Sequence, residues 1–337
     1  MKDTGKNKAG LDIGSHFLKV VEISQGTEKP ALVAFGMKKI TNPSREALAA
    51  QVKSLLDEIR ISSRDLSVSI SGPSVIVRFL SMPKMKDEDL RSAIKFEAEK
   101  FIPFNIADCV IDHYIVRRPA EENKIEILLV AAKKTQVEER IKLVESASFS
   151  VRVVDLDSFA ILNSFLKNFP AAAQGPEKTC AILNIGAAVT NLCIFRSGQI
   201  CLVRDVAIGG NDFTSVISRA LGLDPAAAEE IKCRAKDKLP EIVACTKATI
   251  NTMLDELRLS FSYYENQCGR NIDEIYMTGG SSLLAGIEGH LEEALGLKPK
   301  SWDPFQFLNK EPSSIDVNAL DKVKRYFAVA VGLALRS

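Results

Sequence analysis

The sequence predicts a mixed α/β fold made of two related halves. Residues 10–23 (GLDIGSHFLKVVEI) have the pattern of a strand, a turn and a second strand. The same pattern returns at 180–206, and its turn resembles the first one: DIGS stands at 12–15 and NIGA at 184–187. Helical patterns follow each set of strands. A repeated strand pattern with similar turns indicates a duplicated α/β architecture.

The first half is expected to alternate strands with amphipathic helices. In 44–60, Leu48, Val52 and Leu55 recur at helical spacing. Acidic residues open the helix expected at 87–100, which suits the positive end of a helix dipole. The other elements predicted here are strands at 31–40, 66–70, 75–80, 108–117, 125–132 and 151–155, and helices at 135–149 and 157–168.

The second half is expected to begin with its strands and to continue mainly as helices. Its long helix, 239–266, has apolar residues along one side. The predicted strands are 180–185, 190–195, 199–206 and 273–277, and the predicted helices are 212–221, 226–232, 239–266, 283–295 and 319–335.

The composition excludes several classes of protein. The 337 residues suit two domains, and 44 Lys+Arg balance 43 Asp+Glu, so no basic field attracts nucleic acid. Seven scattered cysteines without a Cys-x-x-Cys pair argue against a disulfide framework or a zinc site. The polar N-terminus lacks an apolar signal segment. The apolar run 327–335 is too short for a bilayer, which needs ~20 residues. We expect a protein that reaches the membrane only through partners.

The turn at 12–15 is a candidate phosphate site. Gly14 lets the backbone approach an anion closely, and Ser15 adds a hydroxyl and an N–H. Asp12 could hold a magnesium-bound water, and Lys19 could reach a phosphate. An ordinary hairpin turn remains the alternative. At the second turn, Asn184 could instead bond its own backbone.

Residues 279–281 (Gly-Gly-Ser) follow a predicted strand and are expected to lead into a helix, which is a common anion-binding arrangement. Glu229 and Lys232 lie three residues apart on a predicted helix, and so on one face. The alternative for this pair is a surface ion pair worth less than ~1 kcal/mol.

Taken in this order, the three elements resemble the actin/Hsp70/sugar-kinase superfamily, which binds ATP between two related halves. The resemblance implies an actin-like (ribonuclease H-like) duplicated α/β fold, with ATP or ADP and Mg²⁺ as cofactors. It assigns phosphate binding to the two turns and adenosine binding to the segments that follow. The cofactor-binding residues it implies are Asp12, Gly14, Ser15, Lys19, Asn184, Gly186, Ala187, Gly209, Gly210, Glu229, Lys232, Gly279, Gly280 and Ser281.

Longer stretches resemble the PilM family of type IV pilus assembly proteins, which is similar in architecture to the division protein FtsA. They include VIVRFLSMPKMKDEDLRSAIKFEAEKFIPF (75–104), IGGNDFTSVISRAL (208–221), AEEIK (228–232) and YFAVAVGLALR (326–336). The resemblance implies an FtsA-type 1C subdomain within the first half. The implied subdomains are 1A at 1–83 and 153–178, 1C at 84–152, 2A at 179–211 and 272–337, and 2B at 212–271.

The second turn departs from the superfamily pattern, which usually has an acid where this chain has Asn184. A neutral amide cannot help to hold hydrated Mg²⁺ or act as a base toward water. We therefore expect ATP binding with weak or absent hydrolysis. His16, His113 and His290 are isolated, and only His16, beside the first turn, is close enough to the site to matter.

The resemblance also implies a partner, the cytoplasmic N-terminal tail of a PilN-like membrane protein, bound between subdomains 1A and 1C. An extended peptide needs an apolar trough with a few polar anchors. The groove residues we expect are Arg78, Leu80, Met82, Phe101, Ile102 and Pro103, with core packing as the alternative. Other pilus platform proteins and the assembly ATPases are further expected partners, at the cytoplasmic face of the bacterial inner membrane.

The sequence leaves three other functions to consider. A metabolic kinase of the superfamily would need a catalytic acid beside a sugar pocket, and the sequence offers none. An FtsA-like polymerising division protein would be expected to carry a membrane-binding amphipathic tail, which does not follow 319–335. The cytoplasmic module of a type II secretion platform would be expected to continue into a transmembrane helix.

Overall fold

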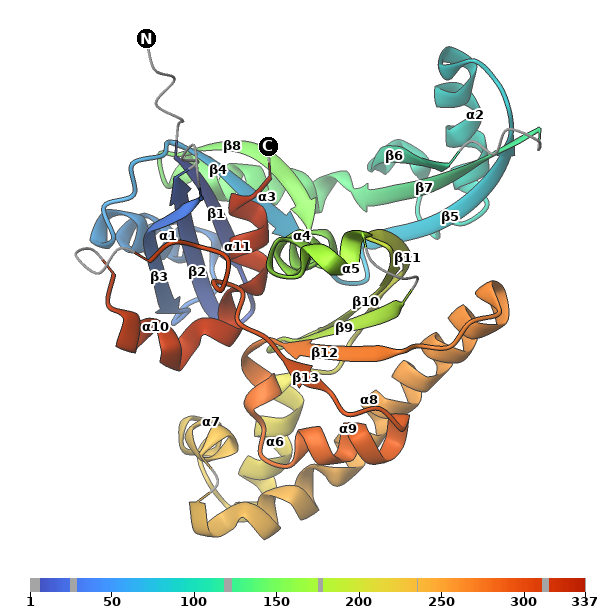
Figure 1. Ribbon diagram of the computed structural model, residues 1–337. Helices are drawn as coiled ribbons and strands as arrows, with labels where there is room; N and C mark the ends of the chain where they lie inside the picture. Colours follow the sequence, from blue (N-terminus) through green and yellow to red (C-terminus); the bar gives the residue numbers. More distant parts are fainter. Residues whose placement is uncertain are drawn as a thin grey trace.

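The computed structural model describes residues 7–24, 29–117, 123–174, 178–234, 236–310 and 315–336. Two five-stranded sheets form its centre, and a three-stranded sheet extends to one side (Figure 1). Within the described ranges, no helix combines the length and the apolar character that a membrane crossing requires. All seven cysteines are free.

The two five-stranded sheets have the same plan, which confirms the predicted duplication. Each begins with an antiparallel meander and continues with two parallel strands. The first sheet has the order β3-β2-β1-β4-β8, from β1 (Lys8–Ile13), β2 (Phe17–Ser24), β3 (Ala31–Lys39), β4 (Asp65–Ile70) and β8 (Ser150–Leu156). The second has the order β11-β10-β9-β12-β13, from β9 (Thr179–Ile185), β10 (Thr190–Arg196), β11 (Gln199–Val206), β12 (Glu274–Thr278) and β13 (Lys300–Ser301).

Helices cover both outer faces of this pair of sheets. Helices α1 (Arg45–Glu58) and α3 (Lys134–Ser146) pack on the first sheet through Val52, Leu56 and Val144. A larger group packs on the second sheet through Phe213, Ile250 and its neighbours. That group consists of α6 (Gly210–Leu221), α7 (Pro225–Cys233), α8 (Leu239–Cys268) and α9 (Ile287–Leu295), with the 3₁₀ turn η2 (Lys236–Lys238) before α8.

Two helices lie between the sheets and join the halves (Figure 1). They are α4 (Asp157–Asn168), followed by α5 (Pro170–Gln174), and α11 (Ala328–Ala334). A Cβ on Gly332 of α11 would lie 1.7 Å from the carbonyl oxygen of Ala160 on α4, so only glycine permits this contact. The apolar interior is therefore shared between the two halves.

The last two predicted helices differ from the structure. Instead of one helix at 319–335, the chain forms α10 (Val317–Val323), the 3₁₀ turn η4 (Lys324–Phe327) and then α11. At η4, the carbonyl of Arg325 accepts from Gly279 N at 2.9 Å and from Thr278 Oγ1 at 3.0 Å. This carbonyl therefore bonds to the end of β12 and not within a continuous helix. After Gly279, the chain forms the 3₁₀ turn η3 (Gly280–Leu283), and α9 begins at Ile287 rather than at the predicted residue 283.

The third sheet has the order β5-β7-β6, from β5 (Val75–Pro83), β7 (Lys124–Lys133) and β6 (Cys109–Arg117). Helix α2 (Asp87–Glu99) covers one face of it, and the 3₁₀ turn η1 (Ile106–Asp108) precedes β6. This sheet begins at Val75, and α3 packs with α1 and β8 rather than with α2. The subdomain limits 1–83, 84–152 and 153–178 stay a prediction.

Candidate functional site

The two similar turns face one cavity between the halves, of about 290 Å³. It collects residues from both hairpins, from the end of α7 and from the segment after β12. Twelve of the predicted cofactor-binding residues line it: Asp12, Gly14, Ser15, Lys19, Asn184, Gly186, Ala187, Glu229, Lys232, Gly279, Gly280 and Ser281.

The first turn is built around an ion pair. Asp12 and Lys19 are cross-strand partners in the β1–β2 hairpin, so their side chains share one face of the sheet. Lys19 Nζ lies 2.5 Å from Asp12 Oδ2, and both side chains are largely buried. Burial raises the pKa of Asp12, and Lys19 opposes this shift. Arg140 donates to the carbonyl of Ile13 at 3.2 Å.

Asp157 adds a second carboxylate beside the first turn. It stands at the start of α4, directly after β8, and accepts from Ser69 Oγ at 2.5 Å. Its charge contributes to the raised pKa of Asp12, and both residues line the cavity. Sequence reasoning missed Asp157, although an acid at the junction of a strand and a helix is a usable signal.

The second turn carries an amide network in place of the ion pair. Asn184 and Asn191 are cross-strand partners, and Asn191 in turn is paired with Asp205 on β11. Asn184 Nδ2 donates to Asn191 Oδ1 at 2.8 Å, and Asn191 Nδ2 donates to Asp205 Oδ1 at 2.7 Å. The other oxygen of Asp205 accepts from the backbone N–H of Gly72 at 2.6 Å. Burial raises the pKa of Asp205, whereas the bonds from Asn191 and Gly72 lower it.

Asn191 and Asp205 were not predicted as site residues, and Asn184 does not bond its own turn. The register of the hairpin could have predicted Asn191. Asn191 follows Asn184 by the same seven positions that separate Lys19 from Asp12. The two pairs therefore occupy equivalent places in the two sheets.

Backbone contacts tie the second turn to α6. Gly210 N donates to the carbonyl of Gly186 at 2.9 Å, and Asn211 N donates to that of Ala187 at 2.7 Å. Gly209 and Gly210 do not line the cavity but support the turn from behind. A Cβ on Gly210 would lie 2.2 Å from Ser281 Oγ, so this close packing requires glycine.

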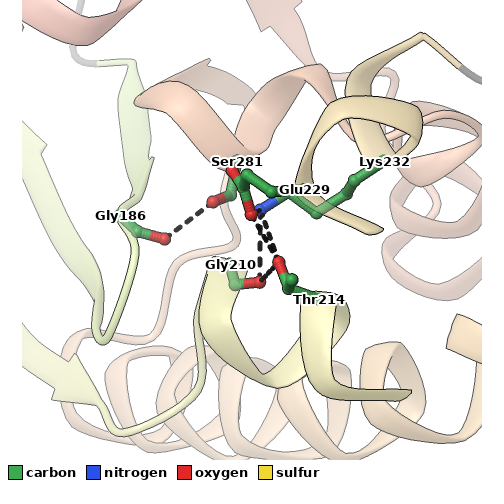
Figure 2. Close-up of polar contacts among 6 residues, drawn as sticks. All are labelled: Gly186, Gly210, Thr214, Glu229, Lys232 and Ser281. Atoms are coloured by element: carbon green, nitrogen blue, oxygen red, sulfur yellow. Dashed lines mark hydrogen bonds and ion pairs between the residues drawn. The ribbon is translucent and has the colours of Figure 1, made fainter. Parts of the chain in front are cut away.

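The buried Lys232 and the partly buried Glu229 form a polar cluster with the start of α6 (Figure 2). Lys232 is 2% exposed, so the alternative of a surface ion pair is wrong. Its Nζ lies 2.5 Å from Glu229 Oε2, and Thr214 Oγ1 donates to the same oxygen. Burial raises the pKa of Glu229, but hydrogen bonds from Lys232 and Thr214 outweigh it and the pKa is lowered.

The segment after β12 closes the cavity against the second turn. Gly279 has a φ of +90°, and a Cβ there would lie 2.4 Å from the carbonyl oxygen of Ile185. Ser281 Oγ donates to the carbonyl of Gly186 at 2.9 Å (Figure 2). A Cβ on Gly280 would meet the ring of Tyr326, which also lines the cavity and was not predicted.

His16 also lines the cavity, near enough to Glu229 and Lys232 for their charges to act on it. Burial lowers its pKa, while the charge of Glu229 raises it. The imidazole therefore favours the neutral form near neutral pH, in which one nitrogen accepts and the other donates.

The six predicted groove residues divide into two groups. Leu80, Met82 and Ile102 belong to the apolar core between α2 and the three-stranded sheet, which is the core-packing alternative. Arg78, Phe101 and Pro103 are exposed, and Phe101 is 42% exposed. Only Arg78 lines a second cavity, of about 220 Å³, which lies between β5, the β8–α4 junction and β11.

Comparison with known proteins assigns this fold. The sequence model of the family described as type IV pilus assembly protein PilM matches residues 10–337. A solved PilM–PilN type IV pilus biogenesis complex contains a chain 30% identical to this one, with 98% of each chain covered and a TM-score of 0.88.

More distant relatives share the architecture. The cell division protein FtsA of Streptococcus pneumoniae serotype 2 (strain D39) is 20% identical, over 93% of this chain and 79% of that protein. The ethanolamine utilization protein EutJ of Carboxydothermus hydrogenoformans is 14% identical at a TM-score of 0.58, with 98% of this chain and 90% of that chain covered. MreB 5 of Spiroplasma citri, solved with AMPPNP, is 13% identical at a TM-score of 0.50, with 98% of this chain and 95% of that chain covered. The predicted actin-like fold is confirmed.

Proposed function

Since the chain belongs to the family of the type IV pilus assembly protein PilM, we propose that it is a nucleotide-binding scaffold of the pilus assembly platform. Its partner is the cytoplasmic N-terminal tail of a PilN-like membrane protein, which holds it at the cytoplasmic face of the inner membrane. Other platform proteins and the assembly ATPases are the further partners of such a scaffold. The single observation that carries the proposal is the match of the family over residues 10–337.

The nucleotide, ATP or ADP, occupies the cavity between the halves. Gly14, Gly186 and Gly279 leave space where a side chain would enter the cavity or strike the backbone. Lys19 supplies a cation to the phosphates, and backbone N–H groups of both turns supply neutral donors. Glu229 and Lys232 lie at the far side, where ribose and base would contact them.

The donor set fits a hydrated Mg²⁺ held together with the nucleotide phosphates. Among the described residues, no group of three or more His, Cys, Asp or Glu side chains could hold a metal. Asp12 and Asp157 provide carboxylates for water-mediated contact, as magnesium prefers. The ion would supply charge neutralisation for the phosphates. Because Asn184 adds neither charge nor basicity, nucleotide binding should exceed turnover.

The PilN-like tail would occupy the cavity that Arg78 lines. Val75, Val77 and Leu156 give it apolar walls, and Arg78 and Arg204 stand at its edge as polar anchors. This combination suits an extended apolar peptide. Phe101 and Pro103 follow α2 and precede Phe104, whose ring lies 4.3 Å from the ammonium of Lys133 at the end of β7, and they form the competing surface.

Nucleotide and partner would be coupled through a shared wall. Five residues, Ser71, Gly72, Pro73, Asp157 and Val189, line both cavities. The bonds from Asn184 through Asn191 and Asp205 to Gly72 connect the second turn to that wall. A nucleotide that shifts the turn would bias the partner site, provided that it binds the two arrangements with different affinity.

Calorimetric titration with ATP, with and without Mg²⁺, tests nucleotide binding. Gly14→Val should abolish binding, because its side chain enters the space beside Lys19. Gly289→Val is the matched control, since a Cβ there meets nothing within 4 Å. Binding that Gly14→Val leaves intact would contradict the assignment of the cavity.

Titration with a synthetic peptide of the N-terminal tail of the PilN homologue from the same genome tests the partner. Val77→Asp and Arg78→Ala should weaken peptide binding, whereas Phe101→Ala should not. The opposite result would place the groove at the exposed surface around Phe101 instead. No peptide binding by the folded wild-type chain, with or without ATP, would overturn the scaffold proposal. The division-protein and secretion alternatives have less support than the family match.

A further inference from the structure

A third cavity, polar in its lining, lies at the opposite end of the first sheet from the nucleotide site. It measures about 330 Å³, at the lower end of the range for small-molecule sites, roughly 300–1,000 Å³. Its walls come from the first residues of β1, β4 and β8 and from the segment after α11. Strand β1 has six residues, so it separates the two cavities by roughly 17–20 Å.

Four cations converge on this cavity: Lys8, Arg64, Arg152 and Arg336. Arg336 is paired with Asp155 at 2.8 Å. Among the described residues, no carboxylate forms an ion pair with the other three. Burial lowers the pKa of Lys8, and the nearby charge of Arg152 lowers it further. Unpaired like charges at close range favour an anion between them.

The nearby carboxylates do not neutralise the cavity. Asp65 lines it, and its Oδ1 accepts from Ser150 Oγ at 2.8 Å. Glu22 lies behind the wall, 1% exposed, and accepts from the backbone N–H of Ser62 and Ser63 and from Ser62 Oγ. These bonds fix the 62–63 loop that forms one side of the cavity.

The backbone aims Arg152 at the cavity. Leu66 pairs with Val151 and Ser67 pairs with Val153, so Arg152 is the extra residue of a β-bulge between β4 and β8. A bulge redirects a side chain and is common beside binding sites. Ser67 is 3% exposed and lines the cavity. A hydroxyl that lines a cavity beside unpaired cations adds a neutral donor to the set available for an anion.

We propose that this cavity binds a phosphate group, with Lys8 and Arg152 as its charged anchors and the Ser67 hydroxyl as a neutral donor. Arg64 and Arg336 close the rim, and the guanidinium of Arg64 is held over the ring of Phe149 at 5.4 Å. Arginine matches phosphate geometry through paired N–H donors. The group belongs either to a soluble phosphate ester or to an anionic lipid headgroup, which have this chemistry in common.

Titration of the full chain with sn-glycerol 3-phosphate, followed by ¹H–¹⁵N spectra, tests the site. Arg152→Gln should weaken binding about tenfold, and Ser67→Ala about threefold, through loss of a charge-assisted and a neutral hydrogen bond. Lys53→Gln removes one charge from exposed α1 and should change nothing. Lys19→Gln, in the nucleotide cavity, should also leave this affinity unchanged. Melting temperatures confirm that each variant is folded.

Flotation with phosphatidylglycerol vesicles, against phosphatidylcholine vesicles, distinguishes the two sources of phosphate. Binding to the anionic vesicles that Arg152→Gln removes assigns the site to a lipid headgroup, and ester binding without vesicle binding assigns it to a soluble ligand. The proposal is overturned if neither probe binds, or if Arg152→Gln has no more effect than Lys53→Gln. If Lys19→Gln alone abolishes binding of the probe, the phosphate binds in the nucleotide cavity instead.

Discussion

The two hairpins of this protein have the same register but different chemistry. Across the first sheet, Asp12 is paired with Lys19, which in turn is paired with Met37. Across the second, Asn184 is paired with Asn191, which is paired with Asp205. The first row therefore has its carboxylate and its cation on the two central strands. The second has neutral amides there and a carboxylate only on the third strand.

This difference separates two tasks. The first row presents charge to the cavity, where a phosphate or a hydrated metal can use it. The second row forms a chain of hydrogen bonds across its strands. The chain ends at Asp205, which accepts from the backbone N–H of Gly72 in the other half. The two turns share a backbone plan, whereas the three paired positions differ; we propose that one row is an electrostatic site and the other a mechanical link between the halves.

The largest difference between the rows should appear in stability. Asp12→Ala leaves the buried ammonium of Lys19 unpaired and should lower the free energy of unfolding by about 3 kcal/mol. Asn184→Ala removes one neutral hydrogen bond and should cost about 1 kcal/mol. Urea denaturation measures both. The double variant Asp12→Ala/Lys19→Met should recover part of the loss, and equal losses in the two single variants would contradict the comparison.

Asn191→Leu should break the mechanical link. It leaves the amide of Asn184 and one oxygen of Asp205 without partners, at a cost of about 2 kcal/mol in unfolding free energy. It should also reduce the effect of ATP on peptide affinity, measured by titration with and without nucleotide. Asn251→Leu, on an exposed position of α8, serves as the control. Unchanged coupling with the same loss of stability would show that the row is only structural.

Asn184→Asp should make the second row resemble the first in charge. A carboxylate beside the phosphates could hold hydrated Mg²⁺ and activate water, so ATP hydrolysis should rise about tenfold. Phosphate release assays measure the rate, with Asn251→Asp as the control for charge. An unchanged rate with intact Mg–ATP binding would mean that Asn184 is not what limits turnover.

The smallest effect concerns pH. Because burial raises the pKa of Asp12 above its ordinary value of 3.8, Asp12 takes up its proton at a higher pH than an exposed aspartate. The Mg²⁺-dependent part of ATP affinity should fall by about threefold as the pH drops toward the raised pKa of Asp12. The same shift makes the folded state bind the proton more tightly, so the contribution of Asp12 to stability rises as pH falls. In Asp12→Asn, both dependences should become smaller by the part that titration of Asp12 contributes; binding calorimetry measures the first and thermal unfolding at several pH values the second.

Much of the fold could be predicted from local pattern. Alternation of apolar residues placed the strands of both meanders, and the paired tetrapeptides at 12–15 and 184–187 predicted the duplication. The errors occurred where tertiary contacts override local preference. Arg325 leaves its helix to bond β12, and Gly279 packs against the second turn before α9 can begin.

The candidate site divides in the same way. The turns, Lys19 and the 279–281 segment were predicted, because hairpin geometry is local and its chemistry is visible in a few adjacent residues. The burial of Lys232 was not, since it depends on how α6 and α7 pack against η3. Leu80 and Met82 were expected in a groove, with core packing as the alternative, and α2 covers their face of the sheet. Ile102 follows α2 and packs in the same core.

The sequence by itself determined the hairpins, their register and therefore the two rows of side chains, because a strand has a period of two and a short turn fixes which residues face each other. Only the tertiary structure decided what those rows enclose. Helices α4 and α11 bring the two sheets together, and that packing joins the turns into one cavity. The packing of α6, α7 and η3 buries Lys232. The neighbouring starts of β1, β4 and β8, with the segment after α11, gather four cations. Such contacts join residues far apart in the chain, so no local pattern specifies them.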